Sequence, residues 1–513
     1  MTAQAASSTD LRTLFEGMDL VVPSMPICEI TSNSRYAVRG GLFLACAGLR
    51  QHGLDFLDQA LAAGIAAVAW ETASGIDVPE LPDAVVGMEV PGLTAKLGTI
   101  ADRFFGSPSA ALAVTGVTGT NGKTTTAFLV AQALNDLQQR AGYMGTIGYG
   151  IGADLEPSSL TTPGCITVHR RLRQLADLGA RHVIAEVSSH ALDQQRVNGV
   201  RFRVAALTNL SRDHLDYHGS IERYAEAKAR LFIGAAGDHR IGTAVINVGD
   251  SFGAALANRL PSGTDVITVA LVNTDDGAPT ARLIGRLTGT RSDGLGLQLA
   301  GDFGEATLNS LLWGRFNAEN LAVATGILLA LGLSLEAAVA ALGRCVAPPG
   351  RMELIRSQQA APTIVIDYAH TPDALRQILE TVRDHCDGHV WCVFGCGGER
   401  DQGKRRAMGE IAALLADRSV ITDDNPRDED PAAIRADIVA GAKLVTGGVT
   451  GGDAGIEVVP DRRNAIEFAI RSAQTGDIVV IAGKGHETRQ LVGAEARAFS
   501  DSAVARSVLG RAE

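Results

Sequence analysis

One glycine-rich segment carries the residues best suited to phosphate chemistry. Between the apolar run ALAVTGVT and an amphipathic segment lies the sequence Gly119-Thr120-Asn121-Gly122-Lys123-Thr124-Thr125. Strand, loop and helix in this order are typical of a P-loop. Its glycines turn backbone N–H groups toward a phosphate, Lys123 adds positive charge, and Thr124 is placed to hold Mg²⁺. Because Val117 stands where the strict pattern has Gly, the sequence predicts a variant P-loop. The alternative is a glycine-rich turn with an incidental lysine.

Polar residues follow the next two apolar runs. HVIAEVSSHAL places Glu186 at a predicted strand end, and TNLSRDHLDYHG places a polar cluster beyond the next strand: Asn209, Asp213, His214, Asp216 and His218. Oxygen and nitrogen ligands at strand ends beside a P-loop suit Mg²⁺ and phosphate binding. We therefore predict metal ligation by Glu186 and His214. The alternatives are helix caps at Asp213 and Asp216 and a solvated His218.

The last third of the chain holds four apolar runs, TIVID, HVWCVF, RSVIT and DIVVIAG, each followed by a polar or glycine-containing loop. Ligands gather at the carboxyl ends of parallel strands, so these loops are candidate sites. After RSVIT, Pro426 stiffens the turn of Asp424-Asn425-Pro426-Arg427 that presents Arg427. The alternative is a plain turn in which Arg427 pairs with Asp428 or Glu429. In GCGGER the third glycine of a dinucleotide motif falls at Arg400, which disfavours hydride transfer.

Length and pattern define the elements that must position these residues. The chain has 513 residues, of which 46% are apolar and 20% charged, and this suits about three α/β domains. Strand and helix patterns alternate after residue 110, which predicts a parallel sheet, and residues 265–313 predict a β-rich insertion. Two buried helices are expected over 321–342, and Pro348-Pro349-Gly350 marks a boundary near 347.

Charge and cysteine content exclude several classes of protein. The formal net charge of −11 disfavours binding to nucleic acid and to anionic membranes, so an anionic substrate needs local positive charge. The seven cysteines are scattered without a CxxC pair, which fits a reducing cytoplasm. The first residues carry no export signal, and no run is suited to membrane insertion. We expect a cytoplasmic monomer.

Four blocks in this order resemble the Mur ligase family: TGTNGKTT, GRFNAENLAVA with Asn317 and Asn320, PGRME with Arg351, and DYAHTPDAL with Asp367. The resemblance implies a three-domain enzyme of peptidoglycan precursor synthesis. Residues 1–109 would bind the UDP-sugar, residues 110–346 would form the central P-loop ATP-binding domain, and residues 347–513 would form a Rossmann-like domain that closes over ATP and the incoming amino acid.

Further blocks are similar to the branch that adds the third residue of the stem peptide: TSNSR, GGLFLACAG, TTPG, EVSSHALDQQRV, NLSRDHLDYHG, GCGGERDQGKR, DDNPR and AGKGHE. By this resemblance Ser34 and Arg35 lie near the uridine diphosphate. The sugar-peptide would meet Thr161, Thr162, Ser188 and Arg196. Asn317 would meet the adenine of ATP, Asp367 its ribose, and Arg351 its phosphates from across the domain cleft.

The resemblance also implies the incoming amino acid. DNPR is similar to the signature of diaminopimelate-adding members, whose matching positions here are Arg400, Asp424, Asn425, Arg427, Gly483 and Glu487. Meso-diaminopimelate carries a second carboxylate, for which a guanidinium is a bidentate partner, and Glu487 would meet an ammonium group. A lysine-adding enzyme is the alternative.

The implied reaction is ATP-dependent peptide-bond formation. The D-glutamyl carboxylate of UDP-N-acetylmuramoyl-L-alanyl-D-glutamate takes the γ-phosphate, and the amine then attacks the acyl phosphate, which releases ADP and phosphate. Lys123, His214 and Lys228 would be catalytic, with two Mg²⁺ ions held by Thr124, Glu186, His214 and Lys228. Composition alone makes Lys228 a solvated lysine, whereas the family implies carbamylation by CO₂. Other readings are a folylpolyglutamate synthetase and a nucleotide switch without ligase activity.

Overall fold

The computed structural model describes residues 8–48, 51–72, 77–234, 241–272, 280–291, 294–357, 361–447 and 455–510. The chain divides into two compact units. The first comprises Met1–Thr268 with Ala330–Gly332, and the second comprises Val269–Leu329 with Leu333–Glu513. Both units are mixed α/β, as the sequence predicts.

The first unit begins with a small parallel sheet in the order β3-β4-β5-β6. Successive side chains of its strands alternate between two cores, as a period of two requires. Leu42 and Leu44 pack with α1 and α3, whereas Phe43 and Ala45 pack with α2. The elements are β1 (Thr9–Asp10), α1 (Leu11–Leu14), β2 (Pro26–Ile27), β3 (Ile30–Thr31), η1 (Ser34–Tyr36), β4 (Leu42–Ala45), η2 (Gly53–Phe56), α2 (Leu57–Ala62), β5 (Ala67–Glu71), β6 (Val86–Val90) and α3 (Leu93–Phe104).

A larger, mainly parallel sheet follows in the first unit. Its order is β10-β9-β8-β11-β7-β12-β13, and β8, β11, β7, β12 and β13 run parallel, so their carboxyl ends share one edge. The elements are α4 (Pro108–Ala111), β7 (Ala113–Thr118), α5 (Lys123–Asp136), β8 (Ala141–Gly145), β9 (Gly148–Ile151), β10 (Asp154–Glu156), α6 (Cys165–Asp177), β11 (His182–Glu186), α7 (Ser189–Asp193), β12 (Phe202–Leu207), α8 (Leu215–His218), α9 (Ile221–Ile233), β13 (Thr243–Asn247) and α10 (Ser251–Ala257).

The division between the units falls inside β14 (Asp265–Val272). Beyond it, β15 pairs parallel with β14, and β15, β16 and β17 form an antiparallel meander, which confirms the predicted β-rich region. The two predicted helices are also confirmed, as α11 and α12. The bounds are β15 (Leu283–Arg291), β16 (Gly294–Gly301), β17 (Gly304–Ser310), α11 (Arg315–Ala330) and α12 (Leu335–Leu342).

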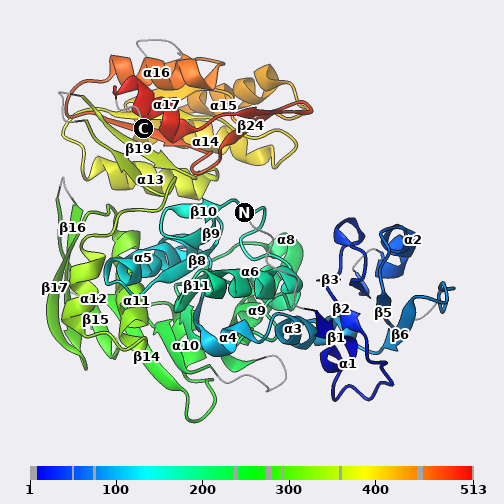
Figure 1. Cartoon of the computed structure of the whole chain (residues 1–513). Helices are drawn as coiled ribbons and strands as arrows, with labels where there is room; N and C mark the ends of the chain where they lie inside the picture. Colours follow the sequence, from blue (N-terminus) through cyan, green and yellow to red (C-terminus); the bar gives the residue numbers. More distant parts are fainter. Residues whose placement is uncertain are drawn as a thin grey trace. The chain divides into compact units, whose positions relative to one another are not determined.

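The second unit ends in a sheet ordered β18-β19-β23-β20-β21-β22, parallel except for β18 at its edge. Helices α13, α14 and α15 cover one face and α16 and α17 the other (Figure 1). All four apolar runs of the last third are strands. The elements are β18 (Glu353–Ile355), β19 (Thr363–Asp367), α13 (Pro372–Arg383), β20 (Val390–Phe394), α14 (Gly403–Leu415), β21 (Arg418–Ile421), α15 (Pro431–Thr446), β22 (Ile456–Val458), α16 (Arg462–Ser472), β23 (Ile478–Ala482), β24 (Arg489–Val492), β25 (Glu495–Ala498) and α17 (Asp501–Val508).

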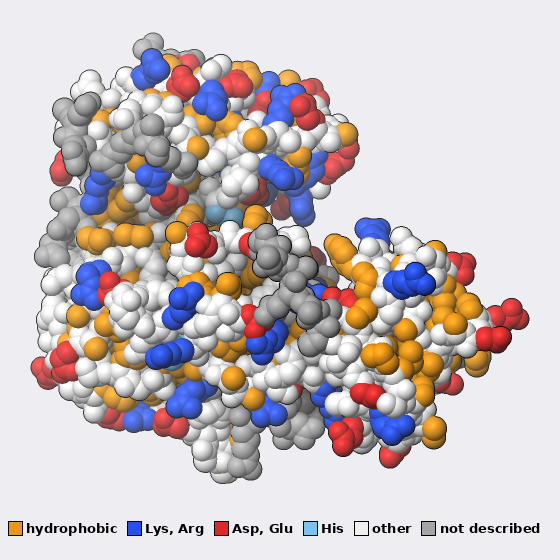
Figure 2. Space-filling model, viewed as in Figure 1, with side chains coloured by type: hydrophobic (Ala, Val, Ile, Leu, Met, Phe, Trp, Pro, Cys, Tyr) orange, Lys and Arg blue, Asp and Glu red, His pale blue; other side chains and the backbone are white. Residues whose placement is uncertain are grey.

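Charge is dispersed, rather than gathered in one area, on the face drawn in Figure 2. On the face drawn in Figure 2, acidic and basic side chains are interspersed on both units. No helix within the described ranges has both the length and the apolar character that crossing a membrane requires.

A buried ion pair joins α16 to α17 and yields a stability prediction. Arg462 donates from Nε and Nη2 to the two carboxylate oxygens of Asp501, each at 2.8 Å, and both side chains are 0% exposed. Asp501→Asn leaves the guanidinium buried without its counter-charge, so we expect a loss of about 3–5 kcal/mol in the free energy of unfolding. Urea unfolding followed by tryptophan fluorescence measures it. The matched control is Glu495→Gln in the exposed pair with Arg497, where we expect a loss of at most about 1 kcal/mol. Equal losses in both variants would contradict the prediction.

Candidate active site

The P-loop joins the end of β7 to the start of α5. Gly119 has a φ of 150°, and a Cβ there would lie 1.9 Å from Oγ1 of Thr208, so only glycine fits. Gly122 precedes the helix with a φ of 82°. The Nζ of Lys123 donates to the carbonyl oxygens of Gly119 at 2.7 Å and Thr120 at 2.8 Å. The ammonium group is thus held over the loop that would receive a phosphate.

A second loop, which follows β12, is hydrogen-bonded to the P-loop. The backbone N–H of Asn121 donates to Oδ1 of Asn209 at 2.9 Å, and that of Thr120 donates to the Asn209 carbonyl at 2.9 Å. Oγ1 of Thr208 donates to the Asn121 carbonyl at 2.6 Å. Asn209 therefore holds the shape of the phosphate loop, a role that its spacing in the sequence did not indicate.

Glu186 connects the P-loop to the neighbouring strand ends. Its carboxylate is 1% exposed and accepts a hydrogen bond from Oγ1 of Thr124 at 2.8 Å. Tyr143 and both the backbone N–H and the hydroxyl of Thr146 also donate to it. The predicted neighbours Thr124 and Glu186 are therefore in direct contact.

These oxygens fit a magnesium ion of the P-loop type. Mg²⁺ favours hard oxygen ligands and keeps waters and substrate phosphates among them, so a hydroxyl and one carboxylate suffice from the protein. No group of three or more His, Cys, Asp or Glu side chains that could hold a metal occurs in the described part of the chain. Beside Thr124 and Glu186, phosphate and water would complete the coordination of such an ion.

The residues predicted for the sugar-peptide lie beside this carboxylate. Oγ1 of Thr162 donates to the Glu186 carbonyl at 2.7 Å and accepts from the backbone N–H of Ser188 at 3.1 Å. Oγ1 of Thr161 lies 3.0 Å from Oγ1 of Thr146. Nη1 of Arg196 donates to the Thr162 carbonyl at 3.0 Å. All four predicted residues are thus linked to the strand end that carries Glu186.

The two residues predicted for uridine diphosphate lie in the small sheet region. Ser34 is buried, and its hydroxyl donates to Oε1 of Gln59 at 2.7 Å. Arg35 is exposed in η1. Among the described residues, the hydrogen bonds of Ser34 and Arg35 do not lead to the P-loop.

Lys228 is not a solvated helix lysine. It lies on α9, is 1% exposed, and its Nζ donates to the Gly119 carbonyl at 2.8 Å. The same Nζ lies 4.3 Å from the centre of the Tyr224 ring. Burial, together with the nearby charge of Lys123, lowers the pKa of Lys228 well below its ordinary value. The amine can therefore lose its proton more readily than a surface lysine.

His214 sits among other rings at the start of α8. Its φ is 52°, its side chain is 48% exposed, and its ring lies 4.8 Å from the ring of His190. His218 is buried, with Nε2 3.0 Å from Oγ of Ser189, so it is not a solvated loop residue. Burial and the neighbouring His214 lower the pKa of His190. His190 was not predicted from the sequence, although the segment EVSSHAL contains it.

The residues predicted for the nucleotide in the second unit make hydrogen bonds within that unit. Asn317 is 1% exposed, donates to the Trp313 carbonyl at 2.8 Å and accepts from Asn320 at 3.0 Å. Asp367 accepts backbone hydrogen bonds from Met352 and Ala369, each at 2.8 Å. Burial raises the pKa of the Asp367 carboxyl, and the Arg351 charge opposes that rise. The polar groups of Asn317 are thus occupied within its own helix region.

Arg427 is held in a constrained turn after β21. Its φ is 53°, its backbone N–H donates to the Leu491 carbonyl at 3.1 Å, and its Nη1 donates to the Gly398 carbonyl at 2.6 Å. Among the described ion pairs, Arg427 has none with Asp428 or Glu429, and Glu429 instead binds Arg405 at 2.7 Å. The plain-turn alternative therefore loses its proposed ion pair.

The other residues of the predicted amino-acid site gather at neighbouring strand ends. Nδ2 of Asn425 donates to Oε2 of Glu487 at 2.9 Å. Gly483 has a φ of 111°, and a Cβ there would lie 2.5 Å from Oδ2 of the buried Asp424. Arg400 is exposed. With Arg427, the loops after β20, β21 and β23 thus supply two guanidinium groups, two carboxylates and an amide.

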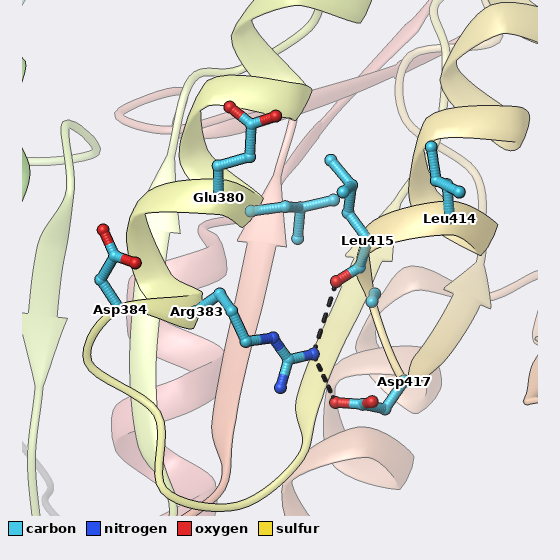
Figure 3. A pocket seen from close by; sticks show the side chains of 8 residues that line it. Glu380, Arg383, Asp384, Leu414, Leu415 and Asp417 are labelled. Atoms are coloured by element: carbon cyan, nitrogen blue, oxygen red, sulfur yellow. Dashed lines mark hydrogen bonds and ion pairs between the residues drawn. The ribbon is translucent and has the colours of Figure 1, made fainter.

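A separate pocket lies where α13 meets the end of α14 (Figure 3). Arg383 crosses it and donates from Nη2 to Oδ2 of Asp417 at 2.6 Å. None of the predicted site residues is among its lining residues, which are Leu379, Glu380, Arg383, Asp384, Leu414, Leu415, Ala416 and Asp417.

Comparison with known proteins identifies the family. Three family models match in sequence order: "Mur ligase family, catalytic domain" over residues 26–105, "Mur ligase middle domain" over 117–328 and "Mur ligase, glutamate ligase domain" over 350–485. The chain belongs to the Mur ligase family.

Relatives are similar over nearly the whole chain. A UDP-N-acetylmuramoyl-L-alanyl-D-glutamate--2,6-diaminopimelate ligase from Alkalilimnicola ehrlichii is 45% identical over 513 residues, which cover 98% of this chain and 99% of the relative. A solved structure of a ligase with the same name is 35% identical, with a TM-score of 0.71 and coverage of 98% and 99%. The folylpolyglutamate synthase of Mycobacterium tuberculosis is 20% identical, with a TM-score of 0.59 and coverage of 82% and 96%, which shows a shared fold alone.

Proposed function

We propose that the chain is an ATP-dependent ligase that adds meso-diaminopimelate to UDP-N-acetylmuramoyl-L-alanyl-D-glutamate in peptidoglycan precursor synthesis. The contact between Thr124 and Glu186 carries the proposal. It links the phosphate loop to the strand end on which Thr162 and Ser188 are held. An acceptor carboxylate bound there would lie beside the terminal phosphate of a nucleotide in the P-loop, as phosphoryl transfer requires.

The reaction we propose has two steps. A carboxylate oxygen of the D-glutamyl group bonds to the γ-phosphorus of ATP while the bond to ADP breaks. The amine nitrogen then bonds to the carbonyl carbon, loses its proton, and phosphate departs with the bonding electron pair. The protein's part is positioning and neutralisation of charge, to which Lys123 contributes an ammonium group at the phosphate loop.

Mg²⁺ would supply further charge neutralisation at the phosphates, with Thr124 and Glu186 as protein ligands. We propose that Lys228 is carbamylated: its neutral amine nitrogen bonds to the carbon of CO₂ and releases a proton, which converts a cation into an anion. The lowered pKa of Lys228, caused first by burial, supports this step. We also propose that His214 is a ligand of a second Mg²⁺ ion.

In the second unit we propose that Arg351, Asp367 and Asn317 contact the nucleotide. Arg35 and Ser34 would contact the uridine diphosphate, and Arg196 the sugar-peptide. The proposed enzyme acts as a cytoplasmic monomer, and the seven free cysteines suit a reducing compartment.

ADP release tests the proposed function. We expect release only when ATP, Mg²⁺, the UDP-sugar dipeptide and meso-diaminopimelate are all present. A folylpolyglutamate synthetase would instead need a folate substrate and glutamate. ADP release with neither the dipeptide nor the amino acid present would favour a nucleotide switch and contradict the proposal.

Arg427 should determine the choice of amino acid. Its guanidinium can pair with the distal carboxylate of meso-diaminopimelate, and it would repel the ε-ammonium of lysine. We expect Arg427→Ala to raise the KM for meso-diaminopimelate by about a hundredfold, as loss of a charge-assisted pair does, while the KM for ATP stays within about twofold. Steady-state kinetics with both amino acids measures this. Unchanged selectivity in Arg427→Ala would show that another group reads the distal carboxylate.

A further inference from the structure

Lys484 is a buried cation that no step of the proposed reaction uses. It follows β23 and is 0% exposed. Its Nζ donates to Oε2 of Glu487 at 2.8 Å and to Oδ1 of Asn425 at 3.0 Å. Burial of an ammonium group is costly unless its hydrogen bonds and charge are compensated, so these two contacts define its environment.

The lysine fixes the orientation of the Asn425 amide. An ammonium group only donates hydrogen bonds, so the oxygen of Asn425 must face Lys484. The backbone N–H of Leu491 donates to the same oxygen at 3.0 Å. With the oxygen held by two donors, the NH₂ group faces Glu487 and donates to its Oε2. One buried charge thus sets the positions of both side chains.

This arrangement leaves the second carboxylate oxygen of Glu487, Oε1, available to a ligand. Oε2 accepts from both Asn425 and Lys484, whereas Oε1 accepts no hydrogen bond from the residues that the structure describes. The Glu487 side chain is 34% exposed, so a ligand can reach it. An ammonium group is the natural partner of such a carboxylate oxygen.

Several charges act on Glu487. Burial raises the pKa of its carboxyl, but the hydrogen bond and charge of Lys484, together with Asn425, outweigh burial and leave it below the ordinary value. The other titratable groups that interact with Glu487 are Tyr368, Asp424, Arg462 and His486.

We propose that Lys484 is a positioning residue for the incoming amino acid: it locks Asn425 and Glu487 so that Oε1 of Glu487 receives the substrate ammonium group. The inference rests on the proposed function and deepens it. It assigns a role in substrate binding to a side chain that is itself too buried to touch the substrate.

The test is steady-state kinetics of Lys484→Met, which keeps the length of the side chain and removes its charge. We expect the KM for meso-diaminopimelate to rise by about tenfold to a hundredfold, while the KM for ATP and for the UDP-sugar dipeptide stays within about twofold. Lys484→Gln keeps hydrogen-bonding capacity without charge and serves if the Met variant does not fold.

A pH profile separates positioning from a merely structural role. Without Lys484, only the hydrogen bond from Asn425 and the charge of His486 oppose the effect of burial, so the Glu487 pKa should be higher than in the wild type and the carboxyl should take up a proton more readily as pH falls. The KM for meso-diaminopimelate should then rise more steeply with falling pH than in the wild type. Adding Glu487→Gln to the Lys484 variant should remove that extra slope.

The matched control lies at the other end of the same strand. Asp477 precedes β23, is 5% exposed, and accepts from the backbone N–H of His389 at 2.8 Å and of Gln474 at 2.9 Å. Asp477→Asn should lower stability without a selective change in the KM for the amino acid. If Lys484→Met keeps the wild-type KM and pH profile, or raises all three KM values alike, positioning by Lys484 is wrong. Failure of the wild-type chain to release ADP with all substrates would instead overturn the proposed function.

Discussion

Lys123→Ala should lower kcat by about a thousandfold or more while the chain still folds. The ammonium group is held over the P-loop by the carbonyls of Gly119 and Thr120, and such a charge stabilises the phosphates as negative charge shifts between them. The side chain is only partly buried, so its removal should change the free energy of unfolding by about 1 kcal/mol at most. Phosphate release and thermal unfolding measure the two effects.

Lys96 offers a matched control in the same unit. Its Nζ also donates to a backbone carbonyl, that of Pro91 at 2.7 Å, which lies outside the phosphate loop. Lys96→Ala should keep full turnover. If Lys123→Ala retained turnover within a few-fold of the wild type, the P-loop would have no part in phosphoryl transfer.

Lys228→Ala should be nearly inactive, with a fall in kcat of about a thousandfold, and short-chain carboxylates should restore part of it. The carbamate would supply an anion at a position where the gene encodes a cation, so a diffusible carboxylate can take its place. Initial rates with and without added acetate or formate measure this. Removal of CO₂ from wild-type assays should also slow turnover, and bicarbonate should restore it.

Lys228→Arg distinguishes a requirement for positive charge at this position from a requirement for carbamylation. Lys228→Arg keeps the positive charge beside the Gly119 carbonyl, but a guanidinium stays protonated and does not react with CO₂. We expect this variant to be as inactive as Lys228→Ala. Full activity in Lys228→Arg would contradict the carbamate hypothesis, because a permanent cation would then suffice for catalysis.

The sequence predicted those elements whose pattern depends only on residues close to them in the chain. The P-loop was expected to lead from a strand into a helix, and the helix α5 spans Lys123–Asp136. The run AVTGVT is β7, and every one of its residues except the first is buried. In both cases periodicity and glycine placement depend on neighbouring residues alone, so no knowledge of distant contacts was needed.

Burial of single charges could not be predicted in the same way. Lys228 lies on an amphipathic helix, and helical spacing does not say that its Nζ would reach the Gly119 carbonyl more than a hundred residues away in sequence. Lys484 stands in a glycine-containing loop that is typical of an exposed turn, yet it is 0% exposed and its Nζ donates to Asn425 and Glu487. Long-range packing decides these cases.

The predicted site residues differ in how much of their placement follows from the sequence pattern. Glu186 and Thr124 are in contact because parallel strands bring their ends to one edge. Asn317 carries no such signal: its polar groups bind Trp313 and Asn320 within the described structure, and only the family resemblance points to the adenine.

The most direct test of the central claim is the identity of the product formed from a panel of amino acids. The purified chain is incubated with ATP, Mg²⁺ and UDP-N-acetylmuramoyl-L-alanyl-D-glutamate, and with either meso-diaminopimelate or L-lysine at matched subsaturating concentrations. Mass spectrometry of the UDP-sugar tripeptide gives the two rates. We predict that the diaminopimelate product forms at least about a hundredfold faster, as expected for a desolvated charge pair with Arg427. Equal rates for the two amino acids, or no tripeptide with either, would contradict the account.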